Sequence, residues 1–210
     1  MFDAANCEIR DVQIHPFHIN YCASANDNGI IHFWDIRQTG KEALKQYITG
    51  HQGVIFSIDW HHTYGNLLAT AGRDRLIKVW DLKLEGKPAH VIQTIASVGK
   101  IKWKPGSVSH IASTHAVNDS RIHIWDSERP NIPCYSLTTH NDVVTGLAFD
   151  HRDLTGNTII SGSKDGTLRI SNILNESYRH FDHLPNSSIA WTPRNDFVYS
   201  HEYVQRSTVK

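Results

Sequence analysis

A Trp-Asp dipeptide recurs along this chain at a nearly constant interval, and this interval restricts the fold more than any other feature. Trp34-Asp35, Trp80-Asp81 and Trp125-Asp126 are separated by 46 and then 45 residues, and Ser171-Asn172 stands 46 residues after the third pair. A repeat of about 40–45 residues accommodates four short strands, which is the length of one propeller blade. The interval therefore predicts one four-stranded unit for each repeat.

The second repeat shows most clearly where its four strands lie. Residues 54–61 alternate between apolar and polar, residues 66–72 are small and apolar, and residues 75–81 alternate again. These patterns are typical of half-buried and fully buried strands. After a loop that contains Gly and Pro, residues 90–95 are predicted as the outer strand. No helical stripe longer than a turn or two interrupts the pattern, so the chain is predicted to be all-β.

The other repeats follow the same order of strands. The predicted blades cover approximately residues 8–50, 51–95, 96–139 and 140–185, and a partial fifth covers 186–210. In the fourth blade the outer strand is expected at 177–184, and the fifth begins with strands at 187–193 and 196–202. Regular spacing of this kind favours a β-propeller over a sandwich.

Composition argues against several classes of function. Lys and Arg together number 21, as do Asp and Glu, so neither broad phosphate binding nor a nucleic-acid partner is expected. No apolar run approaches the roughly 18 residues of a membrane-spanning helix, and the first ten residues lack the apolar stretch of a signal peptide. A cytosolic or nuclear chain is the default. The three cysteines are widely spaced and form no C-x-x-C pair, so they are interpreted as reduced thiols.

The second repeat resembles the WD-repeat family throughout. Gly50-His51 precedes the inner strand, Asp74 occupies the turn between the second and third strands, and Trp80-Asp81 closes the third. In that family the His, a hydroxyl on the second strand, the turn Asp and the Trp form a hydrogen-bonded chain. The resemblance assigns these roles to His51, Thr70, Asp74 and Trp80. Such a chain would give each buried polar group a partner, which is the condition for burying it at low cost.

The other repeats keep only part of this set. The residues kept are His140, Ser161 and Asp165 in the fourth repeat, Asp119 and Trp125 in the third, and Ser24 and Trp34 in the first. The departures are Ser171 at the Trp position of the fourth repeat, Thr94 and Ala5 at the His positions of the third and first, and Asn28 at the Asp position of the first. Family propellers usually have seven blades, so about four and a half predict an incomplete propeller. We expect a fragment whose first and last sheets each leave a face open.

A catalytic interpretation of the same residues is also possible, because His, a hydroxyl and Asp form a triad in many hydrolases. The set recurs at equivalent positions of the repeat, however, and the chain has no G-x-S-x-G, G-x-G-x-x-G or P-loop motif. We therefore expect no enzyme activity and no cofactor. The pairs His61-His62 and His180/His183 could bind a metal, but no third ligand at suitable spacing supports either pair. These histidines are predicted to lie in solvent-exposed loops, and no metal is expected.

Several segments resemble, more specifically, the WD-repeat subunits of the GATOR complex, which activates the TOR kinase. The matching segments include residues 68–74, 78–81, 93–98 and 161–165, and the resemblance covers roughly residues 8–170. It implies a non-catalytic scaffold in amino-acid signalling whose partners are further WD-repeat subunits of a multiprotein complex. It also implies a cytoplasmic protein that the complex recruits to the lysosomal or vacuolar surface, without direct insertion into the membrane.

Propellers bind partners through the loops at the two ends of their channel. The candidate contacts in the loops before the inner strands and between the second and third strands are Gln52, Arg73, Asn141, Asp142 and Lys164. Arg73 is the strongest of these because Arg is enriched at binding hot spots, although a solvated turn residue is the simpler interpretation. An alternative function is that of a substrate receptor for a cullin ubiquitin ligase. Residues 34–37 resemble the W-D-x-R motif with which such receptors dock their adaptor, which makes Arg37 a candidate contact.

Overall fold

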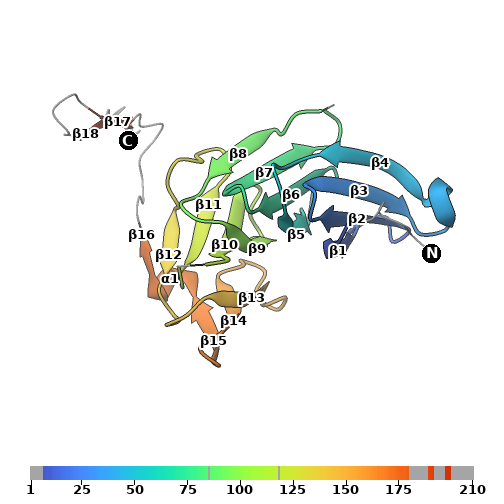
Figure 1. Ribbon diagram of the computed structural model, residues 1–210. Helices are drawn as coiled ribbons and strands as arrows, with labels where there is room; N and C mark the ends of the chain where they lie inside the picture. The colour runs from blue at the N-terminus through green and yellow to red at the C-terminus, as the bar shows by residue number, and fades with distance from the viewer. Residues whose placement is uncertain (1–6, 85, 118, 180–188, 192–196, 200–210) are drawn as a thin grey trace, which may run out of the picture.

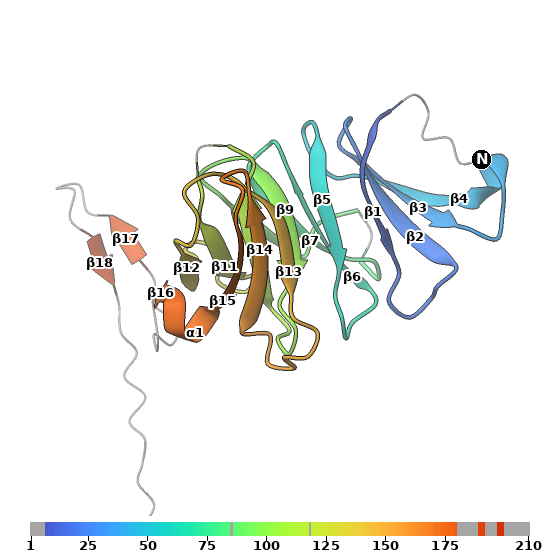
Figure 2. The same ribbon diagram turned by 90° about the horizontal axis from the view of Figure 1, so that it is seen from below.

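The computed structural model describes residues 7–179, apart from 85 and 118, and the backbone of two short strands beyond them. Four antiparallel sheets lie side by side around an arc, and each packs face to face against the next (Figure 1; Figure 2). The first strand of each sheet is nearest the centre of the arc and the last is at its outer edge. This arrangement confirms the predicted all-β fold of an incomplete propeller.

The strands follow the order of the chain within each sheet. The first sheet contains β1 (Ile9–Ile14), β2 (Tyr21–Asn26), β3 (Ile30–Asp35) and β4 (Leu44–Thr49). The second contains β5 (Ile55–Trp60), β6 (Leu67–Gly72), β7 (Leu76–Asp81) and β8 (His90–Gln93). The third begins with β9 (Val98–Trp103), β10 (His110–His115), β11 (Ile122–Asp126) and β12 (Tyr135–Leu137), and the fourth contains β13 (Val144–Phe149), β14 (Thr158–Ser163) and β15 (Leu168–Asn172).

Helical structure in the described part of the chain amounts to two single turns. These are η1 (Gly40–Ala43), before β4, and α1 (Ile173–Glu176), after β15. Neither is long and apolar enough to cross a membrane.

The hydrophobic core lies between neighbouring sheets. On each third strand, two apolar residues spaced two apart point to the same face of the sheet. In β11 these residues are Ile122 and Ile124, both 0% exposed, because the fourth sheet packs over them. Their equivalents in β15, Leu168 and Ile170, are 72% and 64% exposed. Burial at this position of the repeat is therefore supplied by the following sheet.

One predicted strand belongs to a different sheet from the one expected. β16 (Ser177–Arg179) was expected at the outer edge of the fourth sheet, but it pairs antiparallel with β12 of the third. The turn α1 directs the chain away from β15, and its Ile173 is buried in the core between the third and fourth sheets. In the predicted fifth unit, β17 (Ile189–Trp191) and β18 (Phe197–Tyr199) form an antiparallel pair.

Candidate functional site

The second sheet brings all four residues of its predicted network together. Nδ1 of His51 lies 2.9 Å from Oδ1 of Asp74, and Nε2 lies 2.8 Å from the Thr70 hydroxyl oxygen. That oxygen also accepts the indole N–H of Trp80 at 2.8 Å. Because a carboxylate can only accept, Nδ1 of His51 donates to Asp74 and Nε2 accepts the Thr70 hydroxyl proton. The result is a continuous chain of donors and acceptors from the indole to the carboxylate.

Asp74 is the anionic end of this chain. Burial raises the pKa of its carboxyl, but the hydrogen bonds from His51 and from the backbone N–H groups of Gln52 and Leu76 outweigh that effect, so the pKa lies below its usual value. Backbone N–H groups of Gln52 and Leu76 also donate to the carboxylate. Asp74 therefore joins the loop before β5 to the turn between β6 and β7.

The fourth sheet builds a modified version of this network. Nε2 of His140 lies 2.8 Å from the Ser161 hydroxyl, as the repeat predicts. Nδ1 lies 3.0 Å from the Thr167 hydroxyl and 3.4 Å from Asp165, so Thr167 adds a further partner. Ser171, at the Trp position, is 2% exposed. The imidazole and its two predicted neighbours are thus kept where the indole is absent.

In the first sheet, a histidine that sequence reasoning missed takes the place of the absent one. The indole N–H of Trp34 donates to the Ser24 hydroxyl at 2.9 Å, and that hydroxyl lies 3.4 Å from Oδ1 of Asn26. The side-chain amide of Asn26 lies 2.8 Å from Nδ1 of His32. Asn28, at the predicted Asp position, instead accepts a backbone N–H within its own turn.

The third sheet holds its two kept residues, Asp119 and Trp125, in different surroundings. Trp125 donates to the Ser113 hydroxyl at 2.8 Å, whereas Asp119 lies 3.2 Å from Nδ1 of His115 and 3.5 Å from Nε2 of His123. The two residues that the third repeat keeps therefore belong to separate hydrogen-bond networks. The reason is that Thr94, at the His position, donates to backbone carbonyls and offers no imidazole to connect them.

Electrostatics in the Asp119 cluster follow from burial and from one arginine. Burial raises the pKa of Asp119, but Arg121 holds it at about 2 by bonding both carboxylate oxygens at 2.9 Å. Burial, together with the neighbouring His115, lowers the pKa of His123 to about 4. At neutral pH the cluster therefore combines a neutral His123 with an anionic carboxylate.

A sequence signal for the missed histidines was present in the repeat. His32 and His123 both stand two residues before the Trp of their repeat, and Lys78 and Arg169 occupy the equivalent positions of the second and fourth repeats. In a strand, residues two apart point to the same face, so these side chains lie beside the Trp. The ring centroids of His32 and Trp34 are 5.4 Å apart, and those of His123 and Trp125 are 5.8 Å apart.

Another repeated contact joins the first sheet to the second and the second to the third. Nε2 of His15 bonds the carbonyl of Gly65 at 3.0 Å, and Nε2 of His61 bonds that of Val108 at 3.2 Å. Each imidazole also lies 4.7 Å from a Trp ring of the following sheets. His61 is 1% exposed, so its prediction as a solvent-exposed loop residue is wrong. Ala5, His180 and His183 lie outside the described residues.

The loops at one end of the sheets carry most of the predicted contact residues. Gln52 and Arg73 lie there in the second sheet, and Asn141, Asp142 and Lys164 lie there in the fourth; all five are exposed. Arg37 lies at the opposite end, where Asp35 binds its guanidinium at 2.9 and 2.7 Å. The structure thus places Arg37 apart from the other candidates.

A groove of about 610 Å³ lies at the same end as Arg37, where the first sheet meets the second. The residues that line it are His15, Phe17, His18, Thr63, Tyr64, Gly65, Asn66, Leu82 and Lys83.

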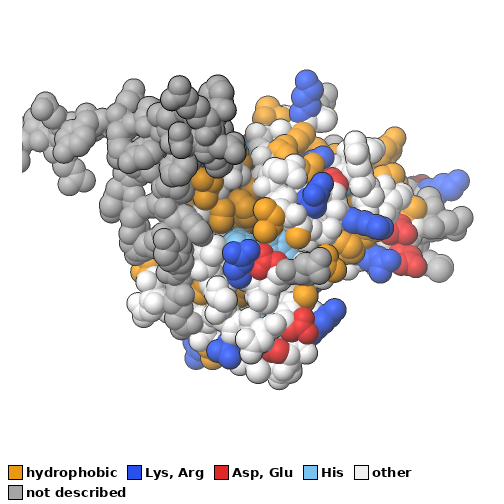
Figure 3. Space-filling view, turned by 60° about the vertical axis from the view of Figure 1, so that its left-hand side comes forward, with side chains coloured by type: hydrophobic (Ala, Val, Ile, Leu, Met, Phe, Trp, Pro, Cys, Tyr) orange, Lys and Arg blue, Asp and Glu red, His pale blue; other side chains and the backbone are white. Residues whose placement is uncertain are grey.

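On the face shown in Figure 3, acidic and basic side chains are interspersed and hydrophobic side chains are exposed between them. Mixed charge and exposed apolar groups suit a protein partner better than a polyanion.

Consecutive antiparallel sheets of three to five strands, with a buried indole and its hydroxyl partner in each of the first three, are the arrangement of an incomplete WD40-type propeller. The family model described as "WD domain, G-beta repeat" matches residues 42–81 and 131–172. The chain therefore carries WD40 repeats over these residues.

Curated proteins with similar sequences show which WD-repeat proteins this chain resembles. The chain is 41% identical over 160 residues to "GATOR2 complex protein WDR24" of Dictyostelium discoideum, which covers 76% of this chain and 15% of that protein. It is 38% identical over 168 residues to the human protein of the same name, covering 80% and 21%. It is also 28% identical over 143 residues to mouse "GATOR2 complex protein WDR59", covering 67% and 14%. The chain thus spans about a fifth or less of these relatives.

Proposed function

We propose that this chain is the protein-binding propeller region of a WD-repeat subunit in a GATOR2-type complex. The observation that carries the proposal is its 38–41% identity to proteins named as subunits of that complex. Its partners would be further WD-repeat subunits, in keeping with the similarity to a second WD-repeat protein named for the same complex. Through the complex it would promote activation of TOR complex 1 by amino acids, reaching the lysosomal or vacuolar surface from the cytoplasm.

The geometry of the buried networks supports a non-catalytic role. The hydroxyl of Thr70, which would be the nucleophile of a triad with His51 and Asp74, is 0% exposed. Its oxygen already accepts the indole N–H of Trp80, and its proton is directed to His51. A nucleophile must reach a substrate atom at about 3 Å, and this hydroxyl is enclosed by its own partners. The set stabilises the sheet and leaves recognition to exposed loops.

Arg73 is the contact that we propose for a partner. Several exposed arginines are held by an Asp two residues earlier in the chain, including Arg121 and Arg152. In the described part of the chain, no hydrogen bond or ion pair engages the guanidinium of Arg73, and the residue is exposed in the turn before β7. A guanidinium without an internal partner can form bidentate bonds to a carboxylate on another protein.

Affinity purification with mass spectrometry, using the full-length protein, tests this proposal. The wild type is compared with Arg73→Glu and with Lys83→Glu, which makes the same charge change at the opposite end of the second sheet. We expect WD-repeat subunits to co-purify with the wild type and with Lys83→Glu. Recovery with Arg73→Glu should fall by about 30-fold, as for loss of a contact worth about 2 kcal/mol.

Each other outcome has a definite meaning. Unchanged recovery with Arg73→Glu would remove Arg73 as a contact, and loss only with Lys83→Glu would place the interface at the groove end. Recovery of a cullin adaptor in place of WD-repeat subunits would refute the GATOR2-type assignment. As a cellular measurement, phosphorylation of TOR complex 1 substrates after amino-acid addition should decline in parallel with recovery.

A further inference from the structure

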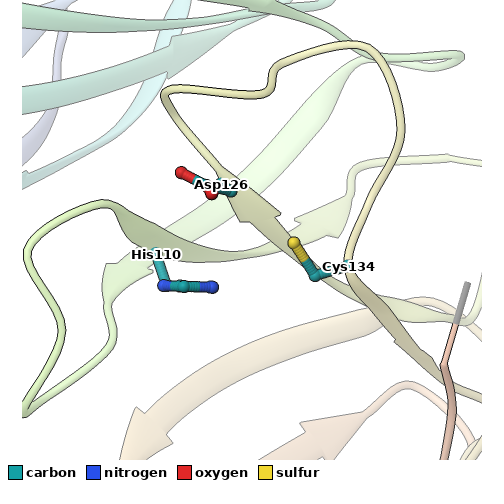
Figure 4. Close-up of side chains that lie close together, drawn as sticks. All are labelled: His110, Asp126 and Cys134. Atoms are coloured by element: carbon teal, nitrogen blue, oxygen red, sulfur yellow. The ribbon is translucent and has the colours of Figure 1, made fainter. Parts of the chain in front are cut away.

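The third sheet gathers three side chains with metal-binding atoms at the end where its Trp-Asp pair lies (Figure 4). His110 begins β10, Asp126 ends β11 directly opposite it, and Cys134 immediately precedes β12. One ligand atom from each residue lies within 4.8 Å of the other two. All three residues are half-buried, so an ion from solvent can reach them.

The other sheets show that this combination is not a general feature of the repeat. Ala89 is equivalent to Cys134, because each donates its backbone N–H to the residue that precedes the Trp. The three equivalent positions are Tyr21, Asp35 and Lys45 in the first sheet and Leu67, Asp81 and Ala89 in the second. In the fourth sheet the first two are Thr158 and Asn172. Within the described sheets, only the third places an imidazole, a carboxylate and a thiol together.

The charge of the carboxylate is balanced differently in the first and third sheets. Asp35 is bound by the guanidinium of Arg37, and the ammonium of Lys45 also lowers its pKa. Asp126 accepts the backbone N–H of Glu128 through Oδ1, and no other donor in the described part of the chain bonds its side chain. Lys104 and Arg129 lie near His110 and Cys134 and contribute positive charge there, and a bound cation would add the direct contact to the carboxylate that Arg37 makes with Asp35.

Ser107 prepares His110 to act as a ligand. The Ser107 hydroxyl oxygen lies 2.6 Å from Nδ1 of His110 and also accepts the backbone N–H of the same residue. Binding of a cation at Nε2 would place the imidazole proton on Nδ1, from where it can be donated to this oxygen. A hydrogen bond of this kind fixes the tautomer and the ring orientation of metal-binding histidines.

From this arrangement we infer that His110, Asp126 and Cys134 bind one divalent cation of the zinc class, with solvent as the fourth ligand. A thiolate beside an imidazole selects Zn²⁺ over Mg²⁺ or Ca²⁺, which prefer oxygen ligands. Tetrahedral Zn²⁺ would hold these three atoms roughly 3.3–3.8 Å apart. Side-chain movements of about 1 Å would reach that geometry from the present separations. The ion would connect β10, β11 and the start of β12.

A second cluster in the same sheet serves as a control. His115, Asp119 and His123 also place ligand atoms within 4.8 Å of one another. There, however, Arg121 binds both oxygens of Asp119 and already balances its charge. The guanidinium would also repel a divalent cation at that position. The inference therefore applies to His110, Asp126 and Cys134 alone.

Metal analysis and cobalt substitution of the full-length protein test the site. The measured quantity is the number of zinc ions per protein molecule. Each variant is compared with the wild type by the difference in this number, so that other metal sites in the full-length protein do not affect the result. We expect Cys134→Ser, His110→Leu and Asp126→Asn each to lose about one equivalent of Zn²⁺. The last two variants introduce residues that equivalent positions of the repeat already carry, so they should fold. Ser107→Ala should weaken binding about 10–100-fold without removing a ligand.

The controls are Cys22→Ser and His123→Asn, which alter a half-buried thiol in another sheet and an imidazole of the control cluster. Both should keep the full zinc content. The thiolate-to-cobalt charge-transfer absorption should decrease by one site with Cys134→Ser and stay unchanged with Cys22→Ser. Zinc content that is equal in the wild type and in folded His110→Leu, judged by circular dichroism, would overturn the inference. So would loss of the same equivalent with either control.

Discussion

Replacement of Thr70 by Val tests whether the buried chain of the second sheet stabilises the propeller as its geometry implies. Valine has nearly the shape of threonine and the same branching at Cβ, so packing and strand propensity change little. The hydroxyl is lost, and with it the acceptor of the indole N–H of Trp80 and the donor to Nε2 of His51. Trp80 is 3% exposed and His51 is 5% exposed, so water cannot replace the lost partner.

The expected magnitude follows from the number of buried groups left without a partner. Each costs about 1–3 kcal/mol, and removing the hydroxyl recovers part of its own desolvation, so Thr70→Val should lower the free energy of unfolding by about 2–4 kcal/mol. Ser113 in the third sheet offers a matched comparison, because it accepts from Trp125 but, among the described residues, forms no hydrogen bond to an imidazole. Ser113→Ala should cost about 1–2 kcal/mol.

Urea unfolding followed by far-UV circular dichroism provides the assay, with Trp80→Phe and the double variant completing a cycle. Phenylalanine removes the indole N–H, so the double variant should be more stable than the sum of the single effects predicts, by about 0.5–1.5 kcal/mol. A loss below about 0.5 kcal/mol for Thr70→Val, or one no larger than that of Ser113→Ala, would refute the argument from unsatisfied partners.

Three further predictions concern pH, packing and the joints between sheets. The pKa of His123 is about 4 in the folded protein and about 6.5 in the unfolded chain. The stabilisation that neutral His123 provides is therefore complete above pH 6.5, and up to about 3 kcal/mol of it is lost as the pH falls toward 4. The urea midpoint of His123→Asn should depend less on pH over this range than that of the wild type. Ile122→Ala should cost about 2–4 kcal/mol and Leu168→Ala less than about 0.5, and equal losses would show that a further layer covers the fourth sheet. His61→Ala should cost about 1–3 kcal/mol by removing its bond to a neighbouring sheet, and hydrogen exchange should increase at the joint between the second and third sheets; unchanged exchange there would contradict a joining role.

The repeat interval predicted the sheets well because it depends on local pattern alone. Alternating residues in β5 and β7 and the dipeptide at Trp80 specify where strands run and which face is apolar. The partner of a buried polar group depends instead on the direction of side chains in three dimensions. For this reason His51 was found from its motif, whereas His32 and His123, which lie on the third strand, were not.

Two other differences arise from contacts between units, which periodicity within one unit does not describe. β16 was assigned by spacing to the fourth sheet, but the free edge of β12 pairs with it. His61 follows an inner strand, where the sequence pattern predicts a loop. Its imidazole N–H nevertheless donates to the Val108 carbonyl of the next sheet, and the residue is buried there. Both features require knowledge of the neighbouring sheet.

Variants of the buried networks and variants of the exposed loops should differ in how they affect stability and partner capture. Thr70 and His51 bond each other inside the sheet, so variants there should reduce stability and partner capture together, in proportion to the fraction of protein that remains folded. Arg73 is exposed and its guanidinium has no internal partner in the described part of the chain, so Arg73→Glu should reduce capture while leaving the urea midpoint within about 0.5 kcal/mol of wild type. If Arg73→Glu and Thr70→Val gave the same ratio of lost capture to lost stability, the loop would act through folding, and recognition would have to be assigned to another surface.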